Sequence, residues 1–183
     1  HRNFIERCIN QALKNLSKED AAQIYMDFDR DTLGLDGSPD IATAIFDKIE
    51  KSVLFVCDVS IVTGGNGTRK APNPNVLIEL GFAVKQLGWD RIICFFDINS
   101  GSIEDLPFDL RQKRILQYDP YKPDEKRRTT AIIEENIKSL YILGKLFNPL
   151  NDYMKGRIDK NLLDICKQVS NMLFGTILMS EGL

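Results

Sequence analysis

The chain has 183 residues, of which 43% are hydrophobic and 27% are charged. These ordinary globular values exclude a disordered tail, a collagen-like fibre and a coiled-coil rod. The formal charge of −2 argues against non-specific nucleic-acid binding, because that function needs a basic surface.

The rarest side chains limit the chemistry that the chain can perform. His1 is the only histidine and stands at the first position, which excludes a catalytic histidine inside the fold. The cysteines Cys8, Cys57, Cys94 and Cys166 form no C-x-x-C pair, which argues against a zinc knuckle or a thiol redox motif. We interpret Cys57 and Cys94, which lie in apolar runs, as small buried side chains in a reducing compartment. Neither a membrane span nor a signal-peptide pattern is found, so we expect a soluble cytoplasmic protein.

The first part of the chain predicts a helix, a strand and a second helix. Apolar residues recur at three- and four-residue steps over 4–16, which predicts a helix with one buried face. The β-prone residues 23–28 predict a strand, followed by a turn-rich stretch. Ser38 is placed to cap the second helix, Pro39 suits its first position, and Asp40 is favourable beside its positive end.

The middle of the chain predicts strands that alternate with helices. The apolar run 52–58 suits a strand covered on both faces of a parallel sheet. Residues 64–70 predict a flexible loop, and Asn-Pro-Asn at 73–75 begins a helix that runs to about residue 87. Further elements are a strand at 91–96, a short turn at 106–111 and a strand at 114–118. This alternation predicts an α/β fold with a parallel sheet.

The last third of the chain differs in composition. Residues 119–130 are rich in Pro, Lys, Arg and Asp and predict a linker, and helical patterns follow at 132–147 and 158–172. We therefore predict an α/β domain over residues 1–120, and a linker with C-terminal helices over 121–183. Open sheets of this kind normally begin with a strand, so we expect a leading strand before His1; the alternative is a sheet of four strands.

Glu79 is the sharpest candidate for a functional residue. In an open parallel sheet, ligands bind outside the carboxyl ends of the strands, where loops and helix starts meet. At ~100° per residue, Asn75, Glu79, Phe82 and Gln86 share one side of the helix, and the other side is apolar. Glu79 is therefore either a residue of the ligand edge or a solvated carboxylate on an amphipathic helix. The free amides at the helix start suit an anion such as phosphate.

Two further residues allow two interpretations each. Asp58 ends a buried strand, where an acid either caps its own loop or binds a ribose hydroxyl. Phe82 either stacks on a base or belongs to the core. Residues 64–70 lack the spacing of a phosphate-binding P-loop.

Four sequence blocks together resemble the bacterial nucleotide-binding TIR-like proteins. The blocks are GSPDI at 37–41, VCDVS at 56–60, NPNVLIELGFA at 73–83 and LPFDLR at 106–111. The resemblance spans residues 3–118 and implies a flavodoxin-like open sheet with helices on both faces. In many TIR-like proteins, one glutamate on the helix after the third strand cleaves the nicotinamide–ribose bond of NAD. Glu79 would fill this catalytic role.

The resemblance also implies a ligand, partners and a setting. NAD or a related nucleotide would be the substrate rather than a bound cofactor, with no metal. By the same analogy Asp58 and Asn75 hold ribose or phosphate, and the loop at 33–40, which contains Ser38 and Asp40, closes over the ligand. We expect self-association and a role as an effector in bacterial defence or signalling.

Two other functions remain open from the sequence. One is a non-catalytic module that binds a nucleotide or assembles with other TIR domains. The other is an enzyme similar to the nucleoside deoxyribosyltransferases, which place a nucleophilic glutamate in a comparable position. The enzymes differ in whether the acceptor is water or a second base.

Overall fold

The computed structural model describes residues 2–18, 29, 40–65, 68–146, 153–154 and 159–169. The chain divides into two compact units, His1–Leu143 and Gly144–Leu183. The composition changes near residue 120, but the first unit continues to residue 143. It does so because the helix Glu125–Ile142 packs onto the first helix of the chain. In the second unit residues 160–169 are helical, inside the predicted range 158–172.

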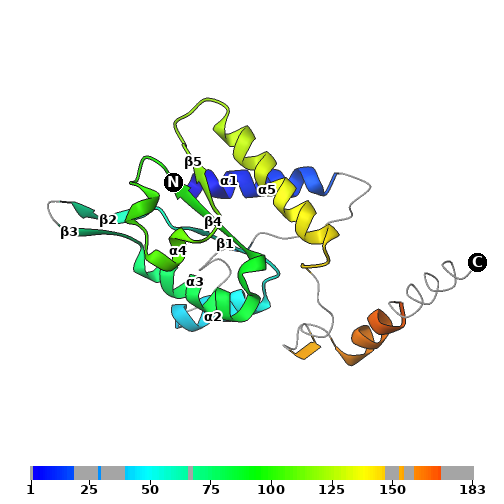
Figure 1. The fold of residues 1–183 in the computed structure, drawn as a ribbon. Helices are drawn as coiled ribbons and strands as arrows, with labels where there is room; N and C mark the ends of the chain where they lie inside the picture. Colours follow the sequence, from blue (N-terminus) through cyan, green and yellow to red (C-terminus); the bar gives the residue numbers. More distant parts are fainter. Residues whose placement is uncertain are drawn as a thin grey trace, which may run out of the picture. The chain divides into compact units, whose positions relative to one another are not determined.

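Among the described residues of the first unit, three parallel strands form the central sheet (Figure 1). β1 (Phe55–Asp58) and β5 (Ile115–Tyr118) flank β4 (Ile92–Asp97), which is the central strand and is almost entirely buried. The predicted parallel α/β sheet is therefore confirmed. The strand predicted at 23–28 lies outside the described residues.

Helices cover both faces of this sheet (Figure 1). Successive side chains of a strand point to opposite faces, so Cys94 and Phe96 of β4 pack with Leu80 of α3 (Pro74–Leu87). Phe95 faces the other way and meets the ring of Tyr118 edge-on, with 6.2 Å between the ring centroids. Tyr118 in turn stacks on Phe4 of α1 (Arg2–Leu16) at 5.4 Å. This arrangement is a flavodoxin-like open sheet.

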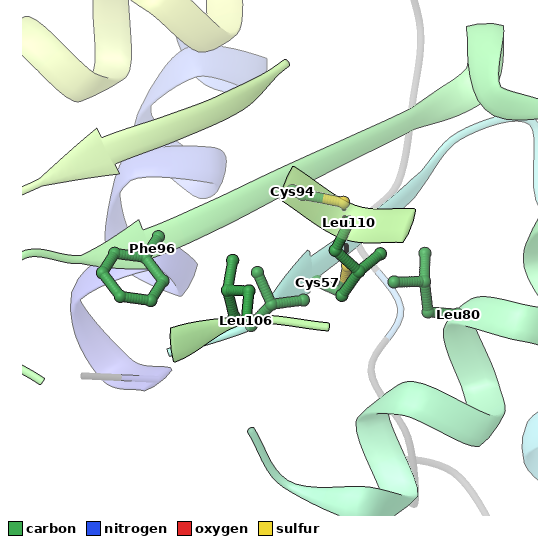
Figure 2. Packing of buried hydrophobic residues seen from close by; sticks show 7 residues of the cluster. Cys57, Leu80, Cys94, Phe96, Leu106 and Leu110 are labelled. Atoms are coloured by element: carbon green, nitrogen blue, oxygen red, sulfur yellow. Dashed lines mark hydrogen bonds between the residues drawn. The ribbon is translucent and has the colours of Figure 1, made fainter. Parts of the chain in front are cut away.

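The core on the α3 side brings together side chains from strands, helices and turns. It contains Cys57, Val59, Leu80, Cys94, Phe96, Leu106 and Leu110. Figure 2 shows the labelled members of this cluster gathered between the strands and α3. Leu106 and Leu110 come from the turn predicted at 106–111, which holds α4 (Phe108–Arg111) and directly follows η2 (Ile103–Asp105). Trp89, in η1 (Trp89–Arg91), packs against the same cluster.

α2 (Ile41–Lys51) begins with a different cap from the one predicted. Asp40 is the N-cap, because its carboxylate accepts hydrogen bonds from the backbone amides of Ala42 and Thr43 at 3.0 and 3.4 Å. These bonds satisfy two amides that the helix leaves free. Asp40 thus takes the capping position expected for Ser38, which lies outside the described residues.

The prediction of a loop over residues 64–70 is wrong for most of these residues. β2 (Ile61–Gly65) and β3 (Thr68–Pro72) pair as an antiparallel hairpin. Tertiary contacts hold this polar sequence in place: the amide of Ile61 donates to Ser100 Oγ at 3.0 Å, and Lys70 Nζ lies 3.0 Å from Asp105 Oδ2. Gly64 has a φ of 117°, and a Cβ there would lie 2.5 Å from Lys70 Cα, so only glycine fits.

The prediction of a linker over residues 119–130 is also wrong for the second half of that range. α5 (Glu125–Ile142) begins inside that range and packs along α1. Arg128 fixes the first turn, because its Nη2 donates to the backbone oxygen of Gln117 at 2.7 Å and to the carboxylate of Glu125 at 2.5 Å. Asn15 of α1 donates to Glu134 of α5 at 2.5 Å.

None of the helices in the described ranges combines the length and the apolar character that crossing a bilayer requires.

Candidate functional site

A hydrogen-bonded network joins the carboxyl ends of the three parallel strands. Asp58 ends β1, Asp97 ends β4 and Tyr118 ends β5. Ser60, two residues after the end of β1, accepts a hydrogen bond on Oγ from the backbone amide of Asp97 at 2.7 Å and donates its own proton to Asp58 Oδ1. The strand ends are therefore fixed to one another by side chains as well as by the sheet.

Asp58 is held through both of its carboxylate oxygens. Oδ2 accepts from the hydroxyl of Tyr118 at 2.7 Å, and Oδ1 accepts from the backbone amide and the hydroxyl of Ser60. Burial raises the pKa of Tyr118 far above its usual value, and the charge of Asp58 raises it further. The raised pKa agrees with the direction of the hydrogen bond, in which the Tyr118 hydroxyl is the donor and Asp58 the acceptor.

The loop after β4 continues the network toward the end of β5. Asp97 Oδ1 accepts from the backbone amide and the side-chain amide of Asn99, each at 2.9 Å. Asn99 Nδ2 also donates to Asp119 at 2.8 Å, and Ser100 Oγ donates to the backbone oxygen of Asp97 at 2.7 Å. Since Ser100 also accepts from Ile61, the β2–β3 hairpin is tied to the same edge of the sheet.

Glu79 lies on the second turn of α3 and is partly buried. The hydrogen bond that Cys57 donates to Cys94, together with burial, raises the pKa of Cys57 well above its usual value, and the charges of Asp58 and Glu79 add to the increase. Glu79 is therefore close enough to β1 for its charge to be felt by Cys57. It also interacts with other groups of the fold.

The start of α3 offers fewer free amides than expected. Asn73 is the N-cap, Pro74 follows it, and the side-chain oxygen of Asn73 accepts from the backbone amide of Asn75 at 2.9 Å. The Asn-Pro-Asn block therefore satisfies one of the donors expected to bind a phosphate. The side chain of Asn75 is exposed one turn before Glu79.

The other candidate residues occupy separate places. Asp58 contacts Tyr118, which lies on the α1 face of the sheet, whereas α3 and Glu79 cover the opposite face. The ring of Phe82 stacks on Phe46 of α2 with centroids 4.6 Å apart, so it joins two helices. Asp40 is exposed and caps α2.

The sequence reasoning missed Ser60, Asp97, Asn99, Ser100 and Tyr118. Asp97 carried the same signal as Asp58, an acid directly after an apolar strand. The role of Tyr118 had no such signal, because its partner lies 60 positions earlier in the chain. Within the described ranges, no group of three or more metal-ligating side chains is placed to hold a metal ion.

Comparison of the chain with family models, curated proteins and solved structures gave no match. The likeness to the TIR-like proteins therefore rests on the four sequence blocks.

Proposed function

We propose that the chain is a TIR-like NAD+ nucleosidase that cleaves the nicotinamide–ribose bond, with Glu79 as its catalytic carboxylate. The observation that carries the proposal is the position of Glu79. It is partly buried on the second turn of α3, and its charge contributes to the raised pKa of Cys57 in β1. Open parallel sheets bind ligands where the carboxyl ends of strands and the starts of helices meet, which supports a role for this early position of the helix.

The chemistry suits a site built without histidine. The nicotinamide of NAD+ is cationic and leaves as a neutral molecule, so its departure needs little acid catalysis. The ribose develops oxocarbenium character as the bond breaks, and a carboxylate beside the ring stabilises that charge. Partial burial strengthens this effect, because water screens the carboxylate less than it would at an open surface.

The proposal gives the neighbouring residues different tasks. Asn75 shares a helix face with Glu79 and is exposed, so we assign it to hydrogen bonding with ribose or phosphate. Asp58 already accepts bonds on both oxygens and lies on the other face of the sheet, so we assign it to holding the strand ends. A cytoplasmic defence or signalling effector that is activated by self-association is the setting we propose.

The decisive experiment compares three forms of the chain with NAD+ as substrate, at protein concentrations that drive assembly. Nicotinamide release is followed by chromatography for the wild type, Glu79→Gln and Glu135→Gln. Glu135 is an exposed glutamate of α5 and serves as the matched control. We expect Glu79→Gln to lose about 100-fold or more in rate, as when a preorganised electrostatic group is removed. Glu135→Gln should retain the wild-type rate.

Other outcomes would select the alternative functions. Equal activity in the wild type and Glu79→Gln would overturn the role of Glu79. A module that only binds nucleotide would show NAD+ binding by calorimetry with no nicotinamide released in any form. A deoxyribosyltransferase would instead exchange the base of a deoxynucleoside when a second base is supplied, and this exchange would require Glu79.

A further inference from the structure

Cys57 and Cys94 face each other across adjacent parallel strands. Cys57 of β1 and Cys94 of β4 are register partners, and both side chains point toward α3. The thiol of Cys57 donates a hydrogen bond to the sulfur of Cys94, with 3.5 Å between the two sulfur atoms. Both residues are free thiols, and Figure 2 shows them beside Leu80 and Leu110.

This arrangement already fits the backbone requirements of a disulfide. Neighbouring strands lie about 4.8 Å apart, and disulfides join residues whose Cα atoms are about 4.4–6.8 Å apart. The sulfur atoms need to approach from 3.5 Å to a bond length of about 2.05 Å, which side-chain rotation can provide. No change of strand register is required, because the two residues are already paired.

The two thiols differ in acidity in a way that favours reaction between them. The hydrogen bond from Cys57 lowers the pKa of Cys94, whereas donating that bond and being buried raise the pKa of Cys57. The direction of the hydrogen bond between them therefore favours Cys94 as the attacking sulfur, with Cys57 as the thiol beside it that completes the bond.

We propose that Cys57 and Cys94 form a site of reversible oxidation, at which a peroxide converts the two thiols into a disulfide between β1 and β4. The Cys94 thiolate attacks one peroxide oxygen, which gives a sulfenic acid and, with one proton, water. The Cys57 sulfur then displaces the hydroxyl group from that sulfenic acid and gives up its proton to form a second water. Each sulfur loses one electron and the peroxide gains two. The proposal does not depend on the NAD+ nucleosidase function.

Burial decides which oxidants reach the pair. Cys57 is 7% exposed and Cys94 3% exposed. We therefore expect hydrogen peroxide, a small molecule, to reach them by local opening of the core and bulky thiol reagents to be excluded. The remaining cysteines lack this geometry. Cys8 is buried beside the backbone oxygen of Lys126, and Cys166 belongs to the second unit.

The sequence permits a direct test, because trypsin places each cysteine on its own peptide. Cys57 falls on residues 52–69, Cys94 on 92–111, Cys8 on 8–14 and Cys166 on 161–167. The folded wild-type protein is treated with hydrogen peroxide, then unfolded in an alkylating reagent, digested and analysed by mass spectrometry. We expect a species joining 52–69 to 92–111, lighter than the two peptides together by two hydrogen atoms and abolished by dithiothreitol.

Two comparisons make the result decisive. The double variant Cys8→Ser/Cys166→Ser should form the same cross-linked species, whereas Cys57→Ser should not. The proposal is overturned if peptides 52–69 and 92–111 are recovered fully alkylated while Cys166 in the same sample is oxidised. It is also overturned if the cross-link appears only when peroxide is added to unfolded chain.

Discussion

The two faces of the parallel sheet are closed in different ways. On the face toward α1, the ring of Tyr118 stacks on Phe4 and meets Phe95 edge-on, and the Tyr118 hydroxyl donates to Asp58. On the face toward α3, aliphatic side chains surround the thiols of Cys57 and Cys94. The α1 side carries the single buried thiol of Cys8, whereas the α3 side brings two thiols into contact and has Glu79 on the helix that covers it.

This difference separates the parts of the molecule that stabilise the fold from those available for chemistry. Large aromatic side chains bury the most apolar area per residue, and removing a donor from a partly buried carboxylate such as Asp58 costs stability. The α1 face should therefore tolerate little change. On the α3 face Phe96 is equally buried, but Cys57 and Cys94 are small, so substitutions at these two positions should cost less stability and change reactivity instead.

The largest expected effect is on the α1 face, at Phe95. Its ring is 1% exposed in the centre of the sheet. Phe95→Ala leaves a cavity between two strands and α1, and we expect the free energy of unfolding to fall by about 3–5 kcal/mol. Urea unfolding followed by circular dichroism measures this change. The matched control Phe108→Ala removes a ring that is 65% exposed and should change the unfolding free energy by less than ~1 kcal/mol.

Cys94, the neighbour of Phe95 on the same strand, tests the contrast between the faces. Cys94→Ala removes one sulfur atom from the α3 side and should cost only about 1 kcal/mol. A loss as large as that of Phe95→Ala would show that Cys94 contributes as much to the unfolding free energy as the buried ring. The proposed difference between the thiol positions and the aromatic positions would then be wrong.

An intermediate effect is expected at Tyr118. Tyr118→Phe keeps the stacked ring but removes the hydroxyl that donates to Asp58 Oδ2 at 2.7 Å. One oxygen of a largely enclosed carboxylate then loses its donor, and we expect a loss of about 1–3 kcal/mol in unfolding free energy. The same measurement on Tyr121→Phe, which alters a ring that is 77% exposed, should show almost no change. Equal stability of Tyr118→Phe and wild type would mean that the ring, and not the hydroxyl, accounts for the contribution of Tyr118 to the unfolding free energy.

The main elements of the fold could be predicted because their apolar residues follow a clear period. The three-to-four-residue spacing at 4–16 predicted α1, and the apolar runs before Asp58 and Asp97 predicted β1 and β4. Local chemistry also predicted the start of α3, where Asn73 caps and Pro74 follows. These features depend on neighbouring residues, so they can be read from a single sequence.

The features that could not be predicted depend on partners far away in the chain. The hairpin of β2 and β3 looked like a loop because its residues are polar and rich in glycine, and its anchors are Ser100 and Asp105. The start of α5 looked like a linker because its charges are satisfied by tertiary contacts such as that between Arg128 and Gln117. The Cys57–Cys94 pair was hidden for the same reason, since strand pairing brings together residues 37 positions apart.

The smallest expected effect concerns the charge pair that begins α5. Hydrogen bonds from Arg128 lower the pKa of Glu125. A carboxyl with a lowered pKa stabilises the fold above its unfolded value of about 4.3, and that contribution is lost as the pH falls through the lower, folded value. Arg128 is half exposed, so we expect Glu125→Gln to cost only about 1 kcal/mol at pH 7. Urea unfolding at pH 7 and at a more acidic pH should show this difference in unfolding free energy becoming smaller at the acidic pH, because Glu125 takes up its proton first in the unfolded state. Glu135→Gln, on the same helix but exposed, should show no difference at either pH. If the difference for Glu125→Gln stayed the same at both pH values, packing of the side chain, rather than its charge, would fix the start of α5 against β5.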